Sequence, residues 1–475
     1  MLEKNKDMLP QPEAAIEKIG MGEKMAFALG GGNQAMLSFV IGIYLMFFYT
    51  DIFALPVAIV GVLMLAGRIV DAVSDVLLGA VVDNTTTRWG RIRPYFLWFA
   101  IPTGLSFALM FQVPDWGDTA RVVYAFVTYL IFAVLYTFVL MASTGMLVVS
   151  VRNPQKRTTL NFFTATGSSV VNLILPLFFW SLVMLLGGSG EDAWLSGFPR
   201  AAWILGGIAT VVYFVRFFLH KERYAIKKEQ NPSLWQGIKY TFSNKYYLLI
   251  TLVGFCGNVA LFFITSVLAY YSRLFIGDLN FVTIIMMVYA VSTLICFPIF
   301  SILSKKIAIR KLYIFSLIMA VISAAARVIL GIDNPTIMIV TTGIMGIAGA
   351  GMWFPAVFMA DAVEYGEWKT GKVVIGIMNS VGSFMTKLAM ALVAATLAWM
   401  LAWAGYTADS PLTDPIRAVI TACLTYIPLV LAVIGLIVFV LFFDIDKHMP
   451  KVRAELAERR AEKTAEAEIT EEDTL

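Results

Sequence analysis

The sequence is poor in charge, cysteine and histidine, and these shortages exclude whole classes of protein. Only 14% of the 475 residues are Asp, Glu, Lys or Arg, against about 25% in an average soluble domain. Hydrophobic residues make up 59%, and the mean hydropathy is +0.79. That much apolar surface cannot be hidden in one globular core. The composition therefore excludes a soluble enzyme as the main interpretation, and it excludes a disordered or fibrous chain.

Motifs of catalysis and metal binding are missing as well. The three cysteines lie far apart inside apolar runs, where they fit neither a disulfide framework nor a metal site. The sequence has no GxxxxGKS or GxxxxGKT, no HExxH and no GxSxG, and no polar region is long enough for an ATPase domain. We therefore expect neither an enzyme nor a primary pump, and no cofactor. The net charge of +4 is too small to indicate a nucleic-acid partner.

Long apolar segments dominate what is present. A helix of about 20 apolar residues spans the hydrocarbon core of a bilayer. Twelve such segments cover residues 25–50, 57–82, 94–112, 121–150, 160–186, 200–219, 247–275, 281–303, 312–331, 336–361, 374–404 and 418–443. They predict an all-α polytopic membrane protein with twelve transmembrane helices. The composition alone stays compatible with a channel.

One long internal polar stretch divides the twelve segments into six and six. The predicted units are a polar segment 1–23, an N-terminal bundle 24–219, an inter-bundle loop 220–246, a C-terminal bundle 247–443 and a tail 444–475. We expect the tail to be a solvated helix or disordered. Halves of this kind occur in secondary carriers, in which two bundles rock around a site at the bilayer midplane. The 6+6 plan therefore favours a carrier.

Basic residues gather in alternate loops. The loops after the second, fourth, sixth, eighth and tenth segments contain Arg88, Arg91, Arg93, Arg152, Lys156, Arg157, Lys221, Arg223, Lys227, Lys228, Lys305, Lys306, Arg310, Lys311, Lys369 and Lys372. The intervening loops are short and mostly acidic or neutral. By the positive-inside rule both termini are cytoplasmic, in a multi-pass protein of the plasma (inner) membrane.

Charged residues inside the apolar segments point to function, because they are costly there. Arg68, Asp71 and Asp75 stand at i, i+3 and i+7 on one face of the second segment, and Ser74 adds an oxygen nearby. Two carboxylates a turn apart repel each other unless a proton or a cation neutralises them. The pattern predicts a proton site or a site for a small hard cation bound by oxygens. The alternative is a structural ion-pair network.

The eleventh segment carries the other buried charge, Lys387. Apolar and small residues on both sides prevent it from snorkelling easily. We expect it to pair with Asp71 or Asp75, which would couple cation occupancy to a second helix. The alternative is a lysine that reaches a water-filled cavity and has no coupling role. Asn379 and Ser383 of the same segment suit a hydroxyl-rich ligand, or they serve helix packing.

The first segment has three consecutive glycines at 30–32, followed by Asn33 and Gln34. The glycines permit close packing or a hinge. The two polar side chains predict either ligand contact or packing. Arg273 and Arg327 lie near outer helix ends, and we expect both to snorkel to the interface.

Three motifs resemble those of one transporter family. They are GRIVDAVSDVLLGAVVDNTTTRWGRIRPY at 67–95, YYSRLFIGD at 270–278 and MADAVEYGEWKTG at 359–371. In order and spacing, the chain from the first segment to the twelfth resembles the glycoside–pentoside–hexuronide:cation symporters. This branch of the major facilitator superfamily includes the melibiose carrier. The resemblance implies the major facilitator fold and uptake of a small substrate by alternating access, coupled to Na⁺ or H⁺.

The resemblance also implies roles for individual residues. It implies cation binding and coupling at Arg68, Asp71, Ser74, Asp75, Thr137 and Lys387, with Asp71 and Asp75 as the Na⁺ ligands of a sodium-coupled carrier. Gating roles at the cytoplasmic face are implied for Asp83, Arg88, Arg91, Arg93, Asp361, Glu364 and Lys369. These charges can pair when the inside closes and separate when it opens.

The sugar-binding positions depart from the melibiose-carrier pattern. Its two acids in helices 1 and 4 correspond to Gln34 and Leu140. A tryptophan corresponds to Thr144 and an arginine to Ala165. The residues of the cation site are thus retained, whereas the residues with which the melibiose carrier binds its sugar are not.

We therefore predict a cation-coupled symporter of a glycoside, pentoside, hexuronide or related sugar derivative. The predicted substrate lies between the halves, near Asn33, Gln34, Thr144, Asn379 and Ser383. One alternative is a cation-coupled carrier of an amphipathic solute such as a lysophospholipid. The other is a transporter-like sensor that binds without transport.

Overall fold

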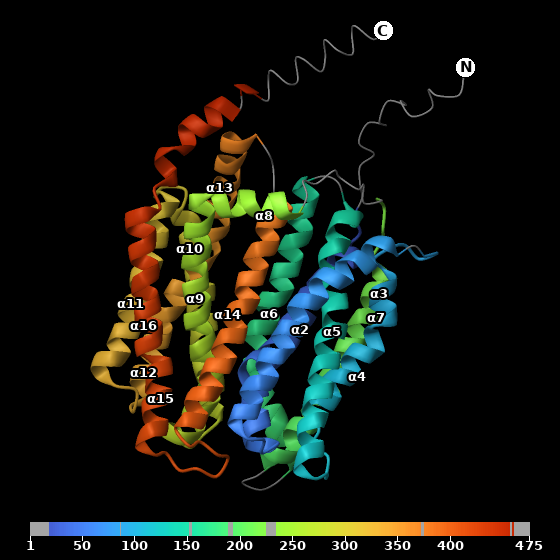
Figure 1. Ribbon diagram of the computed structural model, residues 1–475, viewed down its shortest axis with the longest axis vertical. Coiled ribbons are helices and arrows are strands. Elements are labelled where there is room, and N and C mark those ends of the chain that lie inside the picture. The colour runs from blue at the N-terminus through green and yellow to red at the C-terminus, as the bar shows by residue number, and fades with distance from the viewer. Residues whose placement is uncertain are drawn as a thin grey trace.

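The computed structural model describes residues 19–85, 87–151, 154–188, 193–224, 234–371, 375–456 and 458–459. Figure 1 shows long helices that run side by side in two groups, one from each half of the chain. The predicted all-α architecture is confirmed for these residues. We call the end at which the described chain begins and ends the inner end, following the predicted orientation, and the opposite end the outer end.

The N-terminal bundle contains six helical stretches, and its first helix continues into a π-helical turn. Its elements are α1 (Met21–Phe47) with the turn η1 (Phe48–Ile52), α2 (Val57–Asn84), α3 (Pro94–Trp98), α4 (Ala100–Met110), α5 (Asp118–Ser150), α6 (Pro154–Gly187) and α7 (Ala193–Leu219). The third predicted segment is broken between α3 and α4 at Phe99. Pro102 has no N–H to donate to the carbonyl of Trp98, which explains the break.

The C-terminal bundle repeats this plan. Its elements are α9 (Lys245–Tyr271) with the π-helical turn η2 (Ser272–Ile276), α10 (Asn280–Leu303), α11 (Ile309–Leu330), α12 (Pro335–Ala350), η3 (Gly351–Trp353), α13 (Phe354–Thr370), α14 (Ile375–Trp403), α15 (Asp414–Leu424), α16 (Tyr426–Ile437), η4 (Val438–Phe442) and η5 (Ile445–Lys447). Between the bundles, α8 (Leu234–Ser243) lies across the inner end (Figure 1).

All twelve predicted segments coincide with helical residues. Among the described residues, ten helices are long and apolar enough to cross a membrane. The stretches of the second and third segments, α2 and α3–α4, are not among these ten. The prediction of a helical, membrane-spanning chain is confirmed, and the count of twelve crossings stays a prediction.

Among the described residues, the main contacts between the two bundles come from three pairs of helices. They are α2 with α14, α6 with α10, and α1 with α9. A Cβ at Gly61 of α2 would lie 2.7 Å from the Cβ of Ala398 in α14, so glycine is needed where these helices approach. Within the N-terminal bundle, a Cβ at Gly31 of α1 would lie 2.0 Å from the Thr164 carbonyl oxygen of α6. Gly31 therefore allows α1 and α6 to pack closely, and α1 continues unbroken through it.

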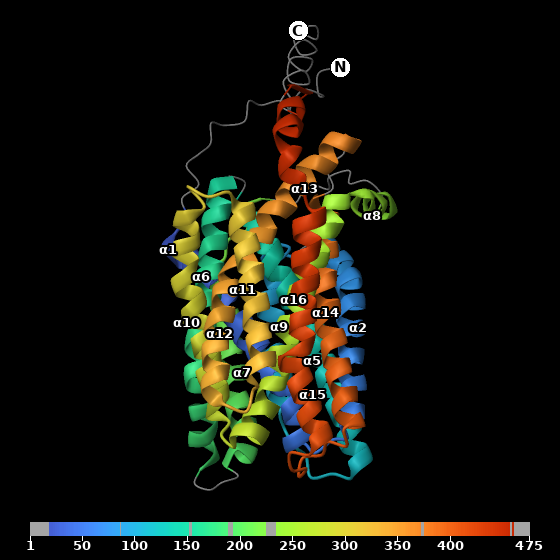
Figure 2. The same ribbon diagram turned by 90° about the vertical axis from the view of Figure 1, so that its left-hand side faces the viewer.

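The sequence expectations for Arg327 and for the tail differ from the structure. Arg327 does not snorkel: it is 2% exposed, and its guanidinium donates to the hydroxyls of Thr341 and Thr342. The described start of the tail is not a solvated helix either. Its apolar residues Met449, Val452 and Leu456 are buried against the inner part of the C-terminal bundle. In Figure 2 this segment stands beside α13.

Candidate functional site

A carboxylate, a hydroxyl and an ammonium group meet where the two bundles touch. Thr137 of α5 donates its hydroxyl to Oδ1 of Asp71 in α2 at 2.7 Å. Nζ of Lys387 in α14 lies 3.4 Å from Oδ2 of the same carboxylate. Thr137 is fully buried, and the side chains of Asp71 and Lys387 are only 13% and 15% exposed. The structure therefore brings together three of the predicted coupling residues, which we call the Asp71 cluster.

The Asp71 cluster contains the groups that are needed for a coupling cation to replace the ammonium group of Lys387 beside Asp71. Carboxylate and hydroxyl oxygens are the ligands that small hard cations prefer. A cation or proton on Asp71 would neutralise the charge that attracts Lys387. Because Lys387 comes from the other bundle, occupancy of Asp71 changes an attraction between the bundles.

The remaining predicted coupling residues lie on the same helix. Arg68 is half-buried one turn before Asp71, and Ser74 is buried one turn after it. The side chain of Asp75 lies outside the described part of the chain, as do those of Asp83 and Asn379. Like those of the other site residues, the roles predicted for these three stay predictions.

Exposed polar side chains continue from the Asp71 cluster along α1, α5 and α14. Gln34 is exposed on α1, and Ser38, one turn further, has its hydroxyl 3.5 Å from that of Tyr136, the neighbour of Thr137. Thr144 is exposed two turns further along α5. These positions give a polar path next to the cluster.

The other predicted substrate residues are placed differently. Ser383 is exposed on α14, one turn before Lys387. Asn33 is only 4% exposed and lies inside the N-terminal bundle beside Tyr213 of α7. Asn33 is thus buried within one bundle, whereas Ser383 is accessible, and the substrate roles of both stay predictions.

At the inner end, the predicted gating loop of the N-terminal bundle is held by a residue that the sequence did not reveal. The carboxylate of Glu222 accepts the backbone N–H groups of Arg91, Ile92 and Arg93, just before α3. Arg93 also donates from Nε to the Phe217 carbonyl. The Arg88 guanidinium is exposed and stacks 4.3 Å from the Trp89 ring.

The acidic residues predicted to gate the C-terminal bundle, Asp361 and Glu364, pair with the tail. Arg453 donates to Asp361 at 2.7 Å and to Glu364 at 3.0 Å. Two turns along α13, Trp368 donates its indole N–H to Glu455 at 2.6 Å. Lys369, also a predicted gating residue, is exposed. Sequence reasoning missed Arg453, although the spacing of the apolar residues in the tail indicates a helix that packs on one face.

At the outer end, charged and hydroxyl groups of both bundles form a second buried cluster. Asp51 in η1 accepts from the guanidinium of Arg273 in η2, and from the Tyr406 hydroxyl at 2.6 Å. Thr50 donates to the other oxygen of Asp51 at 2.5 Å, and its hydroxyl lies 2.8 Å from that of Tyr270. Arg273 therefore pairs across the bundles rather than snorkelling. We call Thr50, Asp51, Tyr270, Arg273 and Tyr406 the outer cluster.

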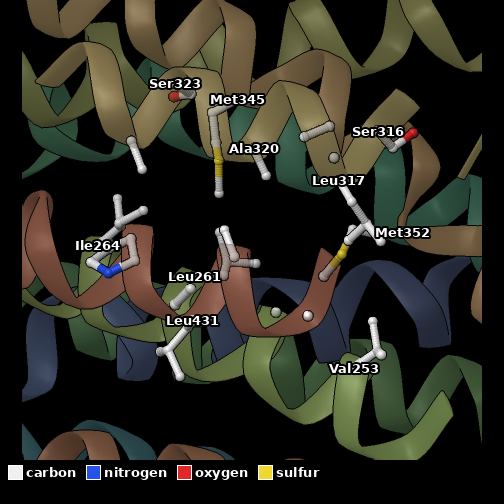
Figure 3. Close-up of a pocket in the computed structure, with 18 of the residues that line it drawn as sticks. Val253, Leu261, Ile264, Ser316, Leu317, Ala320, Ser323, Met345, Met352 and Leu431 are labelled. Carbon is white, nitrogen blue, oxygen red and sulfur yellow. The ribbon is translucent and has the colours of Figure 1, made fainter. Parts of the chain in front are cut away.

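A separate apolar cavity of about 60 Å³ lies inside the C-terminal bundle (Figure 3). Leu261, Leu317 and Leu431 line it from three helices, and Met345 reaches in from a fourth. Most of its lining is apolar, although Ser316, Ser323 and Arg327 also border it. It lies within one bundle, and none of the predicted site residues that the structure describes lines it.

Solved structures show the class of fold. A bacterial homologue of the human lysosomal transporter Spinster, inward-facing and unoccupied, matches with a TM-score of 0.64 and 11% identity, over 91% of this chain and 97% of that chain. A D-xylose–proton symporter matches with a TM-score of 0.60 and 12% identity, over 89% and 96%. The fold is that of a major facilitator transporter.

Sequence comparison then shows the family. Residues 26–447 match the family described as MFS/sugar transport protein. The isoprimeverose transporter of Lactiplantibacillus pentosus is 31% identical over 96% of both chains. The putative glycoside/cation symporter YagG of Escherichia coli is 28% identical, over 81% of this chain and 83% of that one. The chain belongs to the glycoside–pentoside–hexuronide:cation symporter family of the major facilitator superfamily. It is a multi-pass membrane transporter and not an enzyme.

Proposed function

We propose that the protein couples entry of Na⁺ or H⁺ to uptake of a sugar or sugar derivative through the plasma membrane, by alternating access. Both termini are then cytoplasmic. The Asp71 cluster carries this proposal, because one carboxylate there has partners from both bundles. The names of the relatives, an isoprimeverose transporter and a putative glycoside/cation symporter, support a glycoside, pentoside or hexuronide as substrate.

The coupling ion binds at Asp71 and Asp75, with Thr137 lending an oxygen, and displaces Lys387. The freed lysine no longer holds α14 to α2, so the bundle interface changes with cation occupancy. The substrate lies between the bundles near Gln34, Thr144 and Ser383, with Asn33 and Asn379 on the same helices as further predicted contacts. Reciprocity requires that the substrate raise cation affinity by the same factor as the cation raises substrate affinity.

Gating at the inner end uses charges of both bundles. When the inside closes, Arg88, Arg91 and Arg93 with Asp83 meet the acidic stretch of α13 and Lys369. Asp361 and Glu364 are held by Arg453 in the present state. On closure, Asp361 and Glu364 then exchange Arg453 for partners in the N-terminal bundle.

The test compares Asp71→Asn with a matched control, Asp333→Asn. Asp333 is 67% exposed and pairs with Arg417 of its own bundle, so its loss leaves the Asp71 cluster intact. We expect Na⁺ or Li⁺ at constant ionic strength to raise the melting temperature of the wild type and of Asp333→Asn. The rise is lost in Asp71→Asn, because only a ligand that binds the folded state stabilises it. A pH-dependent shift with the same mutant pattern would assign the coupling to protons.

Uptake into proteoliposomes follows with isoprimeverose, other glycosides and uronates as first substrates. The wild type and Asp333→Asn should accumulate one of them against its gradient, and Asp71→Asn should not. Accumulation by Asp71→Asn would contradict the coupling role. Saturable binding without flux in the wild type would indicate a sensor, and a response to lysophospholipids alone would indicate the amphipathic substrate.

A further inference from the structure

The first helices of the two bundles end in the same way. Each consists of 27 α-helical residues followed by a five-residue π-helical turn, η1 after α1 and η2 after α9. π-Helical turns are rare and occur frequently at functional sites. The turn η1 supplies an acid, Asp51, and the turn η2 supplies a base, Arg273. The corresponding π-helical turns of the two halves therefore carry opposite charges, and these charges meet.

The contacts of the outer cluster link the two bundles at several points. Besides Asp51, the guanidinium of Arg273 lies 5.5 Å from the ring of Trp194 in α7, also in the N-terminal bundle. Tyr406, just after α14, places its hydroxyl on Asp51 and packs its ring against Tyr270. The carboxylate of Asp51 is thus the centre on which groups from η2 and from the end of α14 converge.

Because it is buried, the Asp51–Arg273 ion pair can favour the closed state of the outer end over the open state. The Asp51 side chain is fully buried, and that of Arg273 is 28% exposed. Water removal offsets most of the attraction within a buried ion pair, but loss of one partner leaves an uncompensated charge. When the outer end opens, water can solvate both groups again. The closed arrangement therefore needs both charges, while opening leaves neither of them buried alone.

We propose that Asp51 is a gating residue of the transport cycle, through which the N-terminal bundle holds the outer end closed. Arg273 and Tyr406 release it when that end opens to admit substrate. The inference rests on the proposed alternating access. It assigns Asp51 no contact with substrate, and its test requires neither a known substrate nor a known coupling ion.

The test uses a cysteine at Ser272, which is fully buried next to Arg273. The proposal predicts that this position becomes accessible when the outer end opens. The native cysteines Cys256, Cys296 and Cys423 are replaced by alanine. Labelling by a membrane-impermeant maleimide, added to the outside of right-side-out vesicles, measures opening. We expect Asp51→Asn to raise the labelling rate on the order of tenfold, because an unpaired Arg273 disfavours the closed state.

Two comparisons separate a gating role from general loosening. The exchanged pair Asp51→Arg with Arg273→Asp should return the rate toward that of the parent. Asp333→Asn, which removes an exposed ion pair within one bundle, should leave the rate within about twofold of the parent. Size-exclusion chromatography checks that each variant is folded.

Unchanged labelling in folded Asp51→Asn would overturn the proposal. If that variant does not fold, Tyr406→Phe decides, because it removes one hydroxyl from Asp51 and keeps both charges. We expect it to raise labelling about two- to threefold, and an unchanged rate would overturn the proposal in this case too. Normal uptake with unchanged labelling would refute the gate alone. Labelling that follows the expected pattern without sugar uptake would refute the proposed function alone.

Discussion

The two ends of the bundle interface use their charges in opposite ways. At the outer end, Asp51 and Arg273 pair from one bundle to the other. At the inner end, Arg453 holds Asp361 within the C-terminal bundle, and Glu222 holds the loop before α3 within the N-terminal bundle. The outer contacts join the bundles, whereas these inner contacts shape each bundle separately. Buried charges thus join the bundles at the outer end, whereas the charges predicted to gate the inner end are paired locally.

One physical rule explains both kinds of ion pair. A charge at a gate needs a partner in each state, since an unpaired charge is costly wherever water is excluded. A partner within the same bundle is available in every state. Such a pair can therefore keep a charged residue paired while the gate is open. Between bundles, the pair exists in one state only and therefore selects that state.

The largest effect is expected from Glu222→Ala, which tests whether the inner contacts are local. Three backbone N–H groups lose their carboxylate acceptor, so we expect the protein to lose about 2 kcal/mol of stability. The melting temperature should fall by a few degrees, while labelling of a cysteine at position 272 stays at the parent rate. The control is Asp409→Ala, an exposed residue of an outer loop. Increased labelling in Glu222→Ala would show that this inner contact also controls the outer end.

The central part of the site was predictable from the sequence because charge is costly in mid-membrane. Lys387 has few acids at its depth, so Asp71 and Asp75 were its candidate partners, and the structure pairs it with Asp71. The helices were predictable for a related reason, since about 20 apolar residues leave few other structures in a bilayer. The break at Phe99 was missed, although Pro102 stands just after it.

The outer cluster could not be predicted in the same way. Asp51 and Arg273 lie at helix ends, where a charge costs little and indicates only the membrane interface. The two residues are 222 positions apart in sequence, so their pairing depends on how the two bundles dock. Glu222 has no sequence signal of its own, because its role is to accept from backbone groups of a distant loop.

A smaller effect is expected from Arg453→Gln, which frees the acids of α13 at the inner end. Without Arg453, Asp361 and Glu364 become available to the basic loop of the N-terminal bundle, which favours inner closure and outer opening. Arg453 is 59% exposed, so the shift is limited to about 1 kcal/mol or less. Labelling at position 272 should rise at most about fivefold, and Arg417→Gln serves as the control. Slower labelling would indicate that Arg453 favours inner closure instead.

The smallest effect on the outer end is expected from Ala320→Val, which fills part of the cavity inside the C-terminal bundle. Two added methyl groups occupy empty space there, and filling a cavity commonly adds about 0.5–2 kcal/mol of stability. The matched control, Ala395→Val on α14, places the same groups at a position only 3% exposed and should destabilise by overpacking. Neither substitution touches the outer cluster, so labelling at position 272 should not change after Ala320→Val. If labelling fell, the cavity would be space that the C-terminal bundle uses when the outer end opens, and the two ends would be coupled through its interior.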